Sequence, residues 1–228
     1  MDEIVLRPIA HIRTDFASKF GVPRQSGLVP ALTGRIVFAR EFRSPEAVRG
    51  IEGYSHVWLL WQFSQAVRSG APFSPTVRPP RLGGNVRVGV FASRSPFRPN
   101  NLGLSCVILD HVDYDDPEGP VLVVRGADLM DGTPILDVKP YVPYADCRPE
   151  ARGGFTDQVQ ARTVRCDFPP ELLEKIPPDK RAALIGVLEQ DPRPSYQDDA
   201  QRVYGFGFAG REIRFRVSDG LLTVLEVL

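Results

Sequence analysis

Short apolar runs separated by Gly and Pro dominate the first 150 residues of the chain. Five of these runs have the length and the β-branched or apolar composition of strands, at residues 35–39, 56–61, 86–91, 104–109 and 120–125. A short helical turn is expected at 44–48, where Ser44 has the N-cap position and Pro45 the first helical position. Because helix-length crossovers are missing between the runs, the pattern disfavours a doubly wound parallel sheet and favours a barrel or a sandwich.

A different pattern begins after a polar, glycine-containing stretch at 150–154. Residues 178–190 place apolar side chains three and four positions apart, which predicts an amphipathic helix that ends before Pro192. A shorter helical segment is expected at 171–176, and a hairpin with alternating apolar residues over 202–217 precedes a terminal strand. We therefore expect a mainly β domain over residues 1–150 and a small α+β domain over residues 151–228.

Composition narrows the class of protein. The chain has 228 residues, of which 43% are hydrophobic and 25% charged, as in ordinary globular proteins. Its most apolar stretch, 57–61, is far shorter than the roughly 20 residues of a membrane-spanning helix, and the N-terminus lacks the features of an export signal. The three cysteines form no CxxC pair and the three histidines are dispersed. This argues against a disulfide framework or a metal site and favours a reducing, cytoplasmic location.

The formal net charge of zero hides an uneven distribution along the chain. Residues 1–105 carry a net charge of +8, residues 106–150 a net charge of −7, and residues 151–228 a net charge of −1. Of the 28 basic residues, 24 are arginine, whose planar guanidinium suits phosphate binding and base stacking. The pattern fits nucleic-acid binding, although a general bias toward arginine over lysine explains it equally well.

Two polar segments are candidates for a binding site. In the first, residues 92–105 combine Arg94 and Arg98 with two prolines, two asparagines and a glycine. Such a loop is stiff, and its guanidiniums would project from a fixed backbone toward an anionic or carboxylate ligand. The alternative is a compact structural loop whose arginines form ion pairs.

In the second segment, residues 128–144, three carboxylates and Lys139 surround a Gly-Thr-Pro turn. Such carboxylates can bind ribose hydroxyls or an ammonium group, or accept a proton from an attacking amine. The segment therefore fits a site for a nucleoside-type cofactor or for a general base. For Asp131 the alternative is an Asx-turn, in which its carboxylate binds the backbone of the turn that follows.

These two segments, which contain RSPFRPN at 94–100 and DGTP at 131–134, resemble the TrmO (YaeB) family of tRNA methyltransferases. The similarity covers nearly the whole chain, including residues 9–13, 20–28, 48–52, 55–56, 78–85 and 190–196. The resemblance implies an enzyme that uses S-adenosylmethionine to methylate N6 of threonylcarbamoyladenosine next to the anticodon of tRNA. It also implies a β-barrel methyltransferase domain that works as a homodimer, with the cofactor near the subunit interface, and a small C-terminal domain that assists tRNA binding.

The resemblance also implies roles for individual residues. Carried over position by position, cofactor contacts fall on Pro23, Arg24, Gln25, Ser64, Gln65, Arg94, Leu104, Asp128, Leu129, Met130 and Asp131. Members of the family often have His at the position of Ser64. The threonylcarbamoyl group carries a carboxylate that a cation must recognise, and Arg98 and Lys139 are the candidates. Asp137 and Tyr141 are candidates for removing the N6 proton, and the sequence does not rank them.

Two other classes of function stay open. One is a non-catalytic β module that binds S-adenosylmethionine or RNA without methyl transfer, and turnover separates it from the enzyme. The other is a structural protein whose arginine loop stabilises a dimer. That protein would show neither saturable cofactor binding nor a steep salt dependence of tRNA binding.

Overall fold

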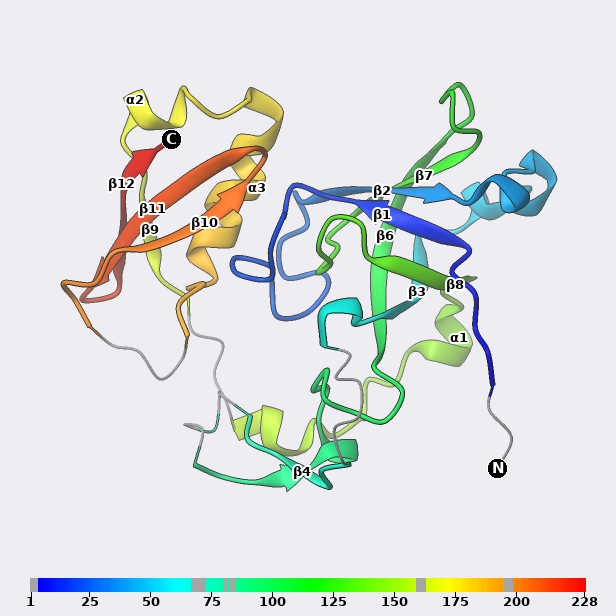
Figure 1. Cartoon of the computed structure of the whole chain (residues 1–228), viewed down its shortest axis with the longest axis horizontal. Helices are drawn as coiled ribbons and strands as arrows, with labels where there is room; N and C mark the ends of the chain where they lie inside the picture. The colour runs from blue at the N-terminus through cyan, green and yellow to red at the C-terminus, as the bar shows by residue number, and fades with distance from the viewer. Residues whose placement is uncertain (1–3, 67–72, 80–81, 83–84, 159–162, 195–198) are drawn as a thin grey trace.

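The computed structural model describes residues 4–66, 73–79, 82, 85–158, 163–194 and 199–228. Several positions in the family-like segments lie outside the described residues: Pro80, Arg81, Gly83, Gly84, Ser195 and Tyr196. The described part forms a β-barrel and a smaller sheet that is accompanied by helices (Figure 1). No helix found there has the length and apolarity needed to cross a membrane.

The barrel consists of six strands: β1 (Ala10–Arg13), β2 (Thr33–Phe38), β3 (His56–Gln62), β6 (Leu102–Asp113), β7 (Val121–Arg125) and β8 (Pro134–Pro140). All neighbours pair antiparallel in the closed order β1–β2–β7–β6–β3–β8. Side chains alternate along β3, where Val57, Leu59 and Trp61 are buried in the barrel core and their neighbours face outward. The prediction of a mainly β fold with a barrel is therefore confirmed.

Short helical turns connect the strands: η1 (Arg40–Phe42), η2 (Pro45–Val48), η3 (Ile51–Gly53), η4 (Ser64–Ala66), η6 (Val90–Ala92), α1 (Pro143–Asp146) and η7 (Gly154–Gln158). The turn expected at 44–48 is η2. Ser44 occupies its N-cap position but forms no side-chain capping hydrogen bond.

The pattern predicts four barrel strands, β2, β3, β6 and β7, but not β1 and β8, whose pairing closes the barrel. The strand expected at 86–91 is wrong. Only Val88–Gly89 (β5) pairs, with Thr76–Val77 (β4), and the residues that follow form η6. Pro75 directly precedes β4 and has no N–H to donate, although its carbonyl still accepts the Val90 N–H at 2.9 Å.

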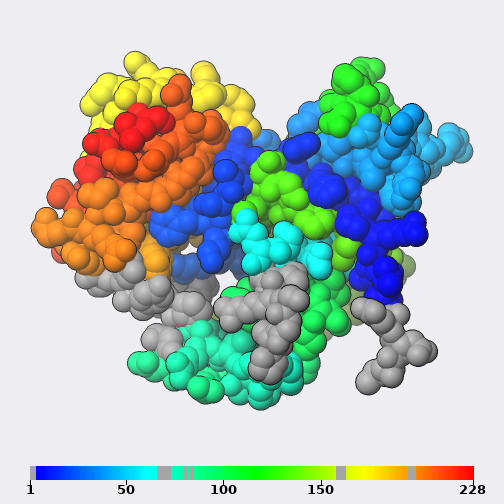
Figure 2. All heavy atoms as spheres, viewed as in Figure 1, coloured from blue at the N-terminus to red at the C-terminus, as the bar shows by residue number. Residues whose placement is uncertain are grey.

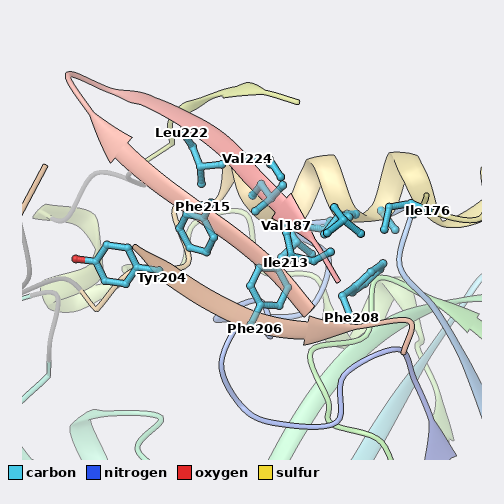
Figure 3. Close-up of a cluster of buried hydrophobic side chains, with 14 of the residues drawn as sticks. Ile176, Val187, Tyr204, Phe206, Phe208, Ile213, Phe215, Leu222 and Val224 are labelled. Atoms are coloured by element: carbon cyan, nitrogen blue, oxygen red, sulfur yellow. The ribbon is translucent and has the colours of Figure 1, made fainter. Parts of the chain in front are cut away.

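The C-terminal sheet has the order β10–β11–β12–β9, with β10 (Tyr204–Phe208), β11 (Arg211–Ser218), β12 (Leu221–Val227) and β9 (Arg165–Asp167). Two helices accompany it, α2 (Pro170–Leu173) and α3 (Pro178–Glu189). The apolar side chains of the sheet, such as Phe206, Ile213 and Val224, gather between the strands and α3 (Figure 3). The predicted long helix and hairpin are confirmed, and β9 adds a parallel strand that the hydrophobic pattern does not predict.

The β1–β2 segment, residues 14–32, packs into this C-terminal core. Its Phe16 is 1% exposed and lies edge-on to Phe208, with the ring centroids 5.3 Å apart. Gly21 has a φ of +93°, and a Cβ added there would lie 2.4 Å from a ring carbon of Phe206, so the close approach requires glycine. The core beneath the C-terminal sheet thus includes residues that precede the second strand of the barrel (Figure 1).

Candidate cofactor and substrate site

The connection between β7 and β8 carries Asp128, which a chain of hydrogen bonds orients. Ser105, at an inward position of β6, donates its hydroxyl to Asp128 Oδ1 at 2.6 Å. Trp61 of β3 donates its indole N–H to Ser105 Oγ at 3.0 Å, which fixes the hydroxyl from the other side. Two barrel strands therefore position this carboxylate.

Burial governs the protonation of Asp128. Desolvation raises the pKa of its carboxyl group, while the Ser105 hydroxyl, a backbone hydrogen bond from Ser26 and the positive charge of Arg94 oppose the rise. A partly desolvated carboxylate gains more from a ligand donor than one in bulk water, because less water competes for it. Asp128 is therefore suited to bind a hydroxyl or an ammonium group.

Arg94 and Gln25 join two loops beside this carboxylate. Arg94 donates a guanidinium N–H to the side-chain oxygen of Gln25, and the Gln25 amide donates to the Arg24 carbonyl at 2.5 Å. Arg94 is exposed, and in the part of the chain that the structure describes it has no ion-pair partner. Its other N–H groups can bind the carboxylate of a ligand.

The Arg24 guanidinium points toward the C-terminal part of the chain. Its Nη2 donates to the carbonyl oxygens of Asp191 and Arg193 at 3.4 and 3.2 Å. These two residues form a buried ion pair, with Arg193 Nε 2.8 Å from Asp191 Oδ1. Pro23, next to Arg24, is buried. Cofactor contacts from Pro23 and Arg24 stay a prediction.

Thr14 holds the turn that contains Asp131. Its backbone N–H donates to Asp131 Oδ1 at 3.0 Å, and its hydroxyl donates to the Leu129 carbonyl at 3.1 Å. The structure differs from the Asx-turn considered for Asp131. The N–H and hydroxyl of Thr133 both donate to the Met130 carbonyl, and the Asp131 carboxylate accepts from Thr14. The Leu129 side chain is 1% exposed and belongs to the barrel core, so only its backbone can reach a ligand.

The other candidates lie on the outer face of β3, β6 and β8. In the register of these strands, Leu60 lies between Leu104 and Asp137. Leu104 is 56% exposed, and Asp137 Oδ2 is 3.1 Å from Lys139 Nζ. The fold thus brings one cofactor candidate, one proton-acceptor candidate and one substrate candidate to the same side of the barrel.

Tyr141 follows β8 on this side. Its ring centroid lies 5.9 Å from that of Trp58 and 6.1 Å from that of His56. Desolvation is the largest of the effects that raise the pKa of the Tyr141 phenol, and the nearby Cys147, Cys106 and Asp146 add to it. A phenol with a raised pKa keeps its proton at neutral pH, so Tyr141 is better suited to donate a hydrogen bond than to act as a base.

Ser64, Gln65 and Arg98 lie in two neighbouring loops. Ser64 and Gln65 belong to η4, directly after β3, and are exposed. The Phe63 N–H donates to the Asn101 carbonyl at 2.8 Å, which places this turn beside the arginine loop. Within that loop Arg98 donates to the Ser93 carbonyl at 3.0 Å, so part of its guanidinium holds the loop itself.

The assembled groups fit S-adenosylmethionine, which carries an ammonium group, a carboxylate, ribose hydroxyls and an adenine ring. Asp128 and Asp131 supply acceptors, and Arg94 supplies a cation. Leu104 offers an exposed apolar side chain. Gly132 adds space, because no heavy atom lies within 4 Å of a Cβ added there. The cofactor role of each residue stays a prediction.

Sequence reasoning missed Ser105 and Thr14. Ser105 could have been found from the alternation of β6. It is a polar residue at a position that faces the barrel interior, in line with Gly103 and Val107. Thr14 has none, since it follows β1, a strand that the hydrophobic pattern does not predict. Within the described ranges, no group of three or more His, Cys, Asp or Glu side chains could hold a metal ion.

Comparison with known proteins identifies the family. The model of the tRNA-methyltransferase O N-terminal domain matches residues 11–147, and the model of the TrmO C-terminal domain matches residues 155–228. The chain belongs to the TrmO family. The family expected from the sequence is therefore confirmed.

Individual TrmO relatives cover almost the whole chain. The Escherichia coli K12 protein named tRNA (adenine(37)-N6)-methyltransferase is 39% identical over 227 residues, which is 96% of this chain and 95% of the relative. The Pseudomonas aeruginosa PAO1 protein named putative S-adenosylmethionine-dependent methyltransferase RcsF is 43% identical, with 96% of each chain covered. The crystal structure of TrmO from Pseudomonas aeruginosa matches with a TM-score of 0.79 at 33% identity, over 100% of both chains. The barrel with a small C-terminal sheet is thus the TrmO fold.

Proposed function

We propose that this TrmO-family protein transfers a methyl group from S-adenosylmethionine to N6 of adenine 37 of tRNA, the nucleotide next to the anticodon. One observation carries the proposal: 39% identity, over 96% of the chain, to an Escherichia coli protein named for this reaction. The site supports it, because Asp128, Arg94 and Asp131 offer the acceptors and the cation that the cofactor needs.

The adenine that is methylated carries a threonylcarbamoyl group, and its carboxylate is recognised by a cation of this chain. Lys139 is one candidate, because its side chain is 73% exposed on the outer barrel face beside Asp137. Arg98 is the other, because it lies in the same loop as the cofactor candidate Arg94. A charged hydrogen bond from Lys139 or Arg98 to the threonylcarbamoyl carboxylate distinguishes the modified adenosine from the unmodified one.

Bound S-adenosylmethionine supplies the electrophilic methyl group, so the protein contributes proximity, orientation and a path for the N6 proton. Asp137 accepts this proton, since its carboxylate lies on the outer face in register with Leu104. Tyr141 keeps its own proton, because its pKa is raised, and orients the reacting groups by donating a hydrogen bond.

Residues 1–150 bind the cofactor, and residues 151–228 assist tRNA binding. Two copies associate through the outer face of β3, β6 and β8, where Leu104 is exposed and Trp58 and Leu60 are half-buried, and the cofactor and the reacting groups lie at the edge of this subunit interface. Apolar side chains in such an arrangement are typical of a face that another chain covers. The protein works in the cytoplasm, which fits its three free cysteines.

A methyl-transfer assay with labelled S-adenosylmethionine tests the function. We expect label in tRNA that carries threonylcarbamoyladenosine and none in the same tRNA without that group. Label in both tRNAs would refute the threonylcarbamoyl requirement. Saturable cofactor binding with no label in either tRNA would refute the enzyme and favour a non-catalytic module.

Arg98→Ala tests substrate recognition separately from cofactor binding. We expect a higher KM for modified tRNA and an unchanged Kd for S-adenosylmethionine by calorimetry. Arg49→Gln is the matched control, because Arg49 is an exposed arginine that pairs with Glu46 outside the site. An equal loss of cofactor binding and tRNA turnover in Arg98→Ala would contradict the assigned role.

Light scattering coupled to size exclusion tests the homodimer. The chain has a mass of 25.3 kDa, so we expect a particle of twice that mass. A particle with the mass of one chain at micromolar concentration would refute the dimer.

A further inference from the structure

A long stretch of the chain has no negative charge. Residues 53–109 contain no Asp or Glu and six arginines. Four of these arginines are described, Arg78, Arg87, Arg94 and Arg98, and no carboxylate within the described ranges forms an ion pair with them. The described arginines of this stretch therefore carry positive charge that no ion pair neutralises.

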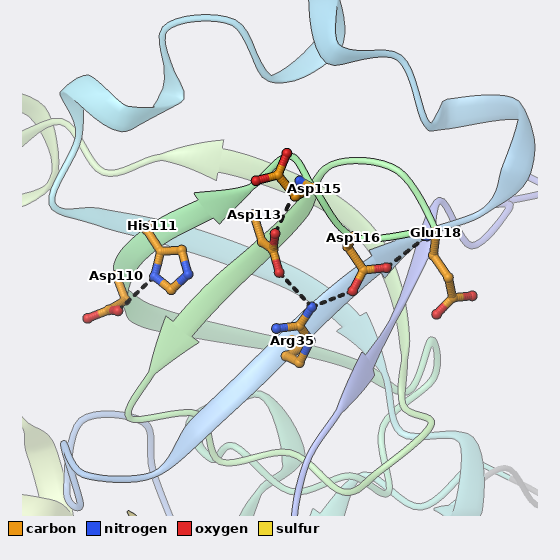
Figure 4. A network of polar contacts seen from close by, with 7 residues as sticks. All are labelled: Arg35, Asp110, His111, Asp113, Asp115, Asp116 and Glu118. Carbon is orange, nitrogen blue, oxygen red and sulfur yellow. Dashed lines mark hydrogen bonds and ion pairs between the residues drawn. The ribbon is translucent and has the colours of Figure 1, made fainter.

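Arginines near the C-terminal end of β6, in contrast, form ion pairs. Arg35 pairs with Asp113 at 3.0 Å and with Asp116 at 2.5 Å (Figure 4). Arg43 likewise pairs with Glu118 at 3.2 Å. Asp113, Asp116 and Glu118 thus neutralise arginines near β2, whereas Arg78 and Arg87 form no ion pair with a carboxylate within the described ranges.

The same stretch carries the exposed phenylalanines. Among the described residues, the phenylalanines classed as exposed are Phe73, Phe91 and Phe97, at 60%, 73% and 49%. The buried phenylalanines of the two cores, such as Phe16 and Phe215, are at most 7% exposed. Exposed aromatic rings that gather among arginines are typical of surfaces that bind a ligand.

Phe73 and Phe91 form a stacked pair on the β4–β5 hairpin. Their ring centroids are 6.4 Å apart and the ring planes differ by 26°. Val90, which directly precedes Phe91, is 1% exposed, and its N–H donates to the Pro75 carbonyl at 2.9 Å. This hydrogen bond joins the residues before β4 to those after β5, so it holds the two segments that carry the phenylalanines beside each other.

Arginines lie next to this pair. Arg87 donates to the Thr76 hydroxyl at 3.3 Å, across the two-residue ladder of β4 and β5, and Arg78 directly follows β4. Both side chains are exposed. In the space-filling view the segment that contains β4, coloured teal, stands out at the lower edge of the molecule (Figure 2).

We propose that Phe73, Phe91, Arg78 and Arg87 form a stacking surface for unpaired bases of the anticodon loop. This proposal rests on the proposed function, because it assigns the surface that holds the tRNA substrate. Exposed aromatic rings stack on unpaired bases, and neighbouring arginines bind the phosphates between them. Paired bases of a duplex do not offer their faces, so the surface selects the single-stranded loop.

The charge decides between RNA and a second copy of this chain as the occupant. In a second copy of this chain, five of the carboxylates of residues 106–150 already form ion pairs within their own chain: Asp110, Asp113, Asp116, Glu118 and Asp137. RNA instead carries one negative charge per nucleotide, so it suits these arginines better. The acid-free stretch and the exposed rings therefore point to the same ligand. We name this group of four residues the Phe–Arg surface.

Fluorescence anisotropy with a labelled anticodon stem-loop RNA tests the Phe–Arg surface without requiring catalysis. For the double variant Phe73→Ala/Phe91→Ala we expect a Kd about 10- to 100-fold higher, as loss of base stacking predicts. Phe91→Tyr keeps an aromatic ring and should bind like the wild type. Arg87→Gln should lower the slope of log Kd against log salt by about 0.7 to 0.9.

Matched controls isolate the effect. Tyr54→Ala removes a 41% exposed aromatic ring directly after η3, outside the Phe–Arg surface, and Arg49→Gln removes an arginine that already has a carboxylate partner. Both should leave RNA binding unchanged. Calorimetric binding of S-adenosylmethionine to each variant shows that the barrel is folded and should give wild-type values.

The proposal is overturned if the double variant binds the stem-loop like the wild type, or if it loses affinity for a duplex RNA of equal length to the same degree. It is also overturned if the double variant changes the mass of the particle, because a second copy would then cover the phenylalanines. A wild-type protein that transfers no methyl group would instead refute the proposed function, whatever the binding results.

Discussion

Phe16→Ala probes the link between the barrel and the C-terminal sheet. Phe16 belongs to the β1–β2 segment, yet its ring packs at 5.3 Å against Phe208 in the C-terminal core. Its carbonyl accepts the Asp131 N–H at 2.9 Å, so the same residue also holds the turn of the candidate cofactor site. Truncation should loosen both regions at once.

The expected cost follows from burial. Phe16 is 1% exposed, and replacing such a ring with a methyl group costs about 3–5 kcal/mol, including the cavity that remains. In a chain of this size 1 kcal/mol lowers Tm by about 2–4 °C, so we expect Tm to fall by roughly 6–20 °C. Phe73→Ala is the matched control, because Phe73 is 60% exposed and its removal should cost less than about 0.5 kcal/mol.

Urea unfolding followed by two signals locates the damage. Both tryptophans, Trp58 and Trp61, lie in β3, so tryptophan fluorescence reports on the barrel and far-UV circular dichroism on the whole chain. In the wild type the two curves should coincide, since the β1–β2 segment couples the two cores. In Phe16→Ala the dichroism curve should begin at lower urea, because the C-terminal core loses a buried ring.

Two results would refute this reasoning. A cost below about 1 kcal/mol in Phe16→Ala would mean that the segment is not part of the C-terminal core in solution. A fluorescence transition that precedes the dichroism transition would mean that the barrel, rather than the C-terminal sheet, depends on this ring.

Three further predictions concern single groups. Asp128→Asn should raise Tm at pH 7 and weaken S-adenosylmethionine binding. Because folding raises the pKa of Asp128, the wild type loses stability as pH rises above about 4, the ordinary pKa of an Asp carboxyl. The higher Tm of Asp128→Asn should therefore disappear below about pH 4, where the wild-type carboxyl is protonated in both states. Scanning fluorimetry across pH measures this difference. Ser105→Ala should cost about 1–3 kcal/mol in urea unfolding, because the Trp61 indole N–H loses its buried acceptor. At pH 8 a thiol reagent should label the exposed Cys147 and spare Cys166, whose pKa burial raises to about 12, and mass spectrometry of peptides checks the order.

Much of the candidate site could be found in the sequence because its signals are local. Arg94 and Arg98 stand in a proline-rich loop, and Asp128 and Asp131 stand beside a Gly-Thr-Pro turn, so residue types and spacing within each segment are enough to single them out. The hydrogen bond from Ser105 to Asp128 joins residues 23 positions apart. No local pattern encodes such a pair, because it depends on which strands become neighbours.

The fold divides in the same way. Short runs of β-branched and apolar residues between Gly and Pro predict β2, β3, β6 and β7. The barrel closes through β1 and β8, whose pairing covers two residue pairs and leaves a weak pattern in the sequence. The residues therefore indicate a β fold, and the pairing of distant edges decides that it is a closed barrel.

The sequence by itself determined the family, the mainly β class, the long C-terminal helix and the segments that carry the chemistry, because these depend on residue type, period and turn geometry. Only the tertiary structure decided that the β1–β2 segment completes the C-terminal core and that the Arg24 guanidinium binds the carbonyls of Asp191 and Arg193. These contacts join residues more than 150 positions apart. Such contacts are selected by packing density and hydrogen-bond satisfaction in the folded chain, which no short stretch of sequence contains.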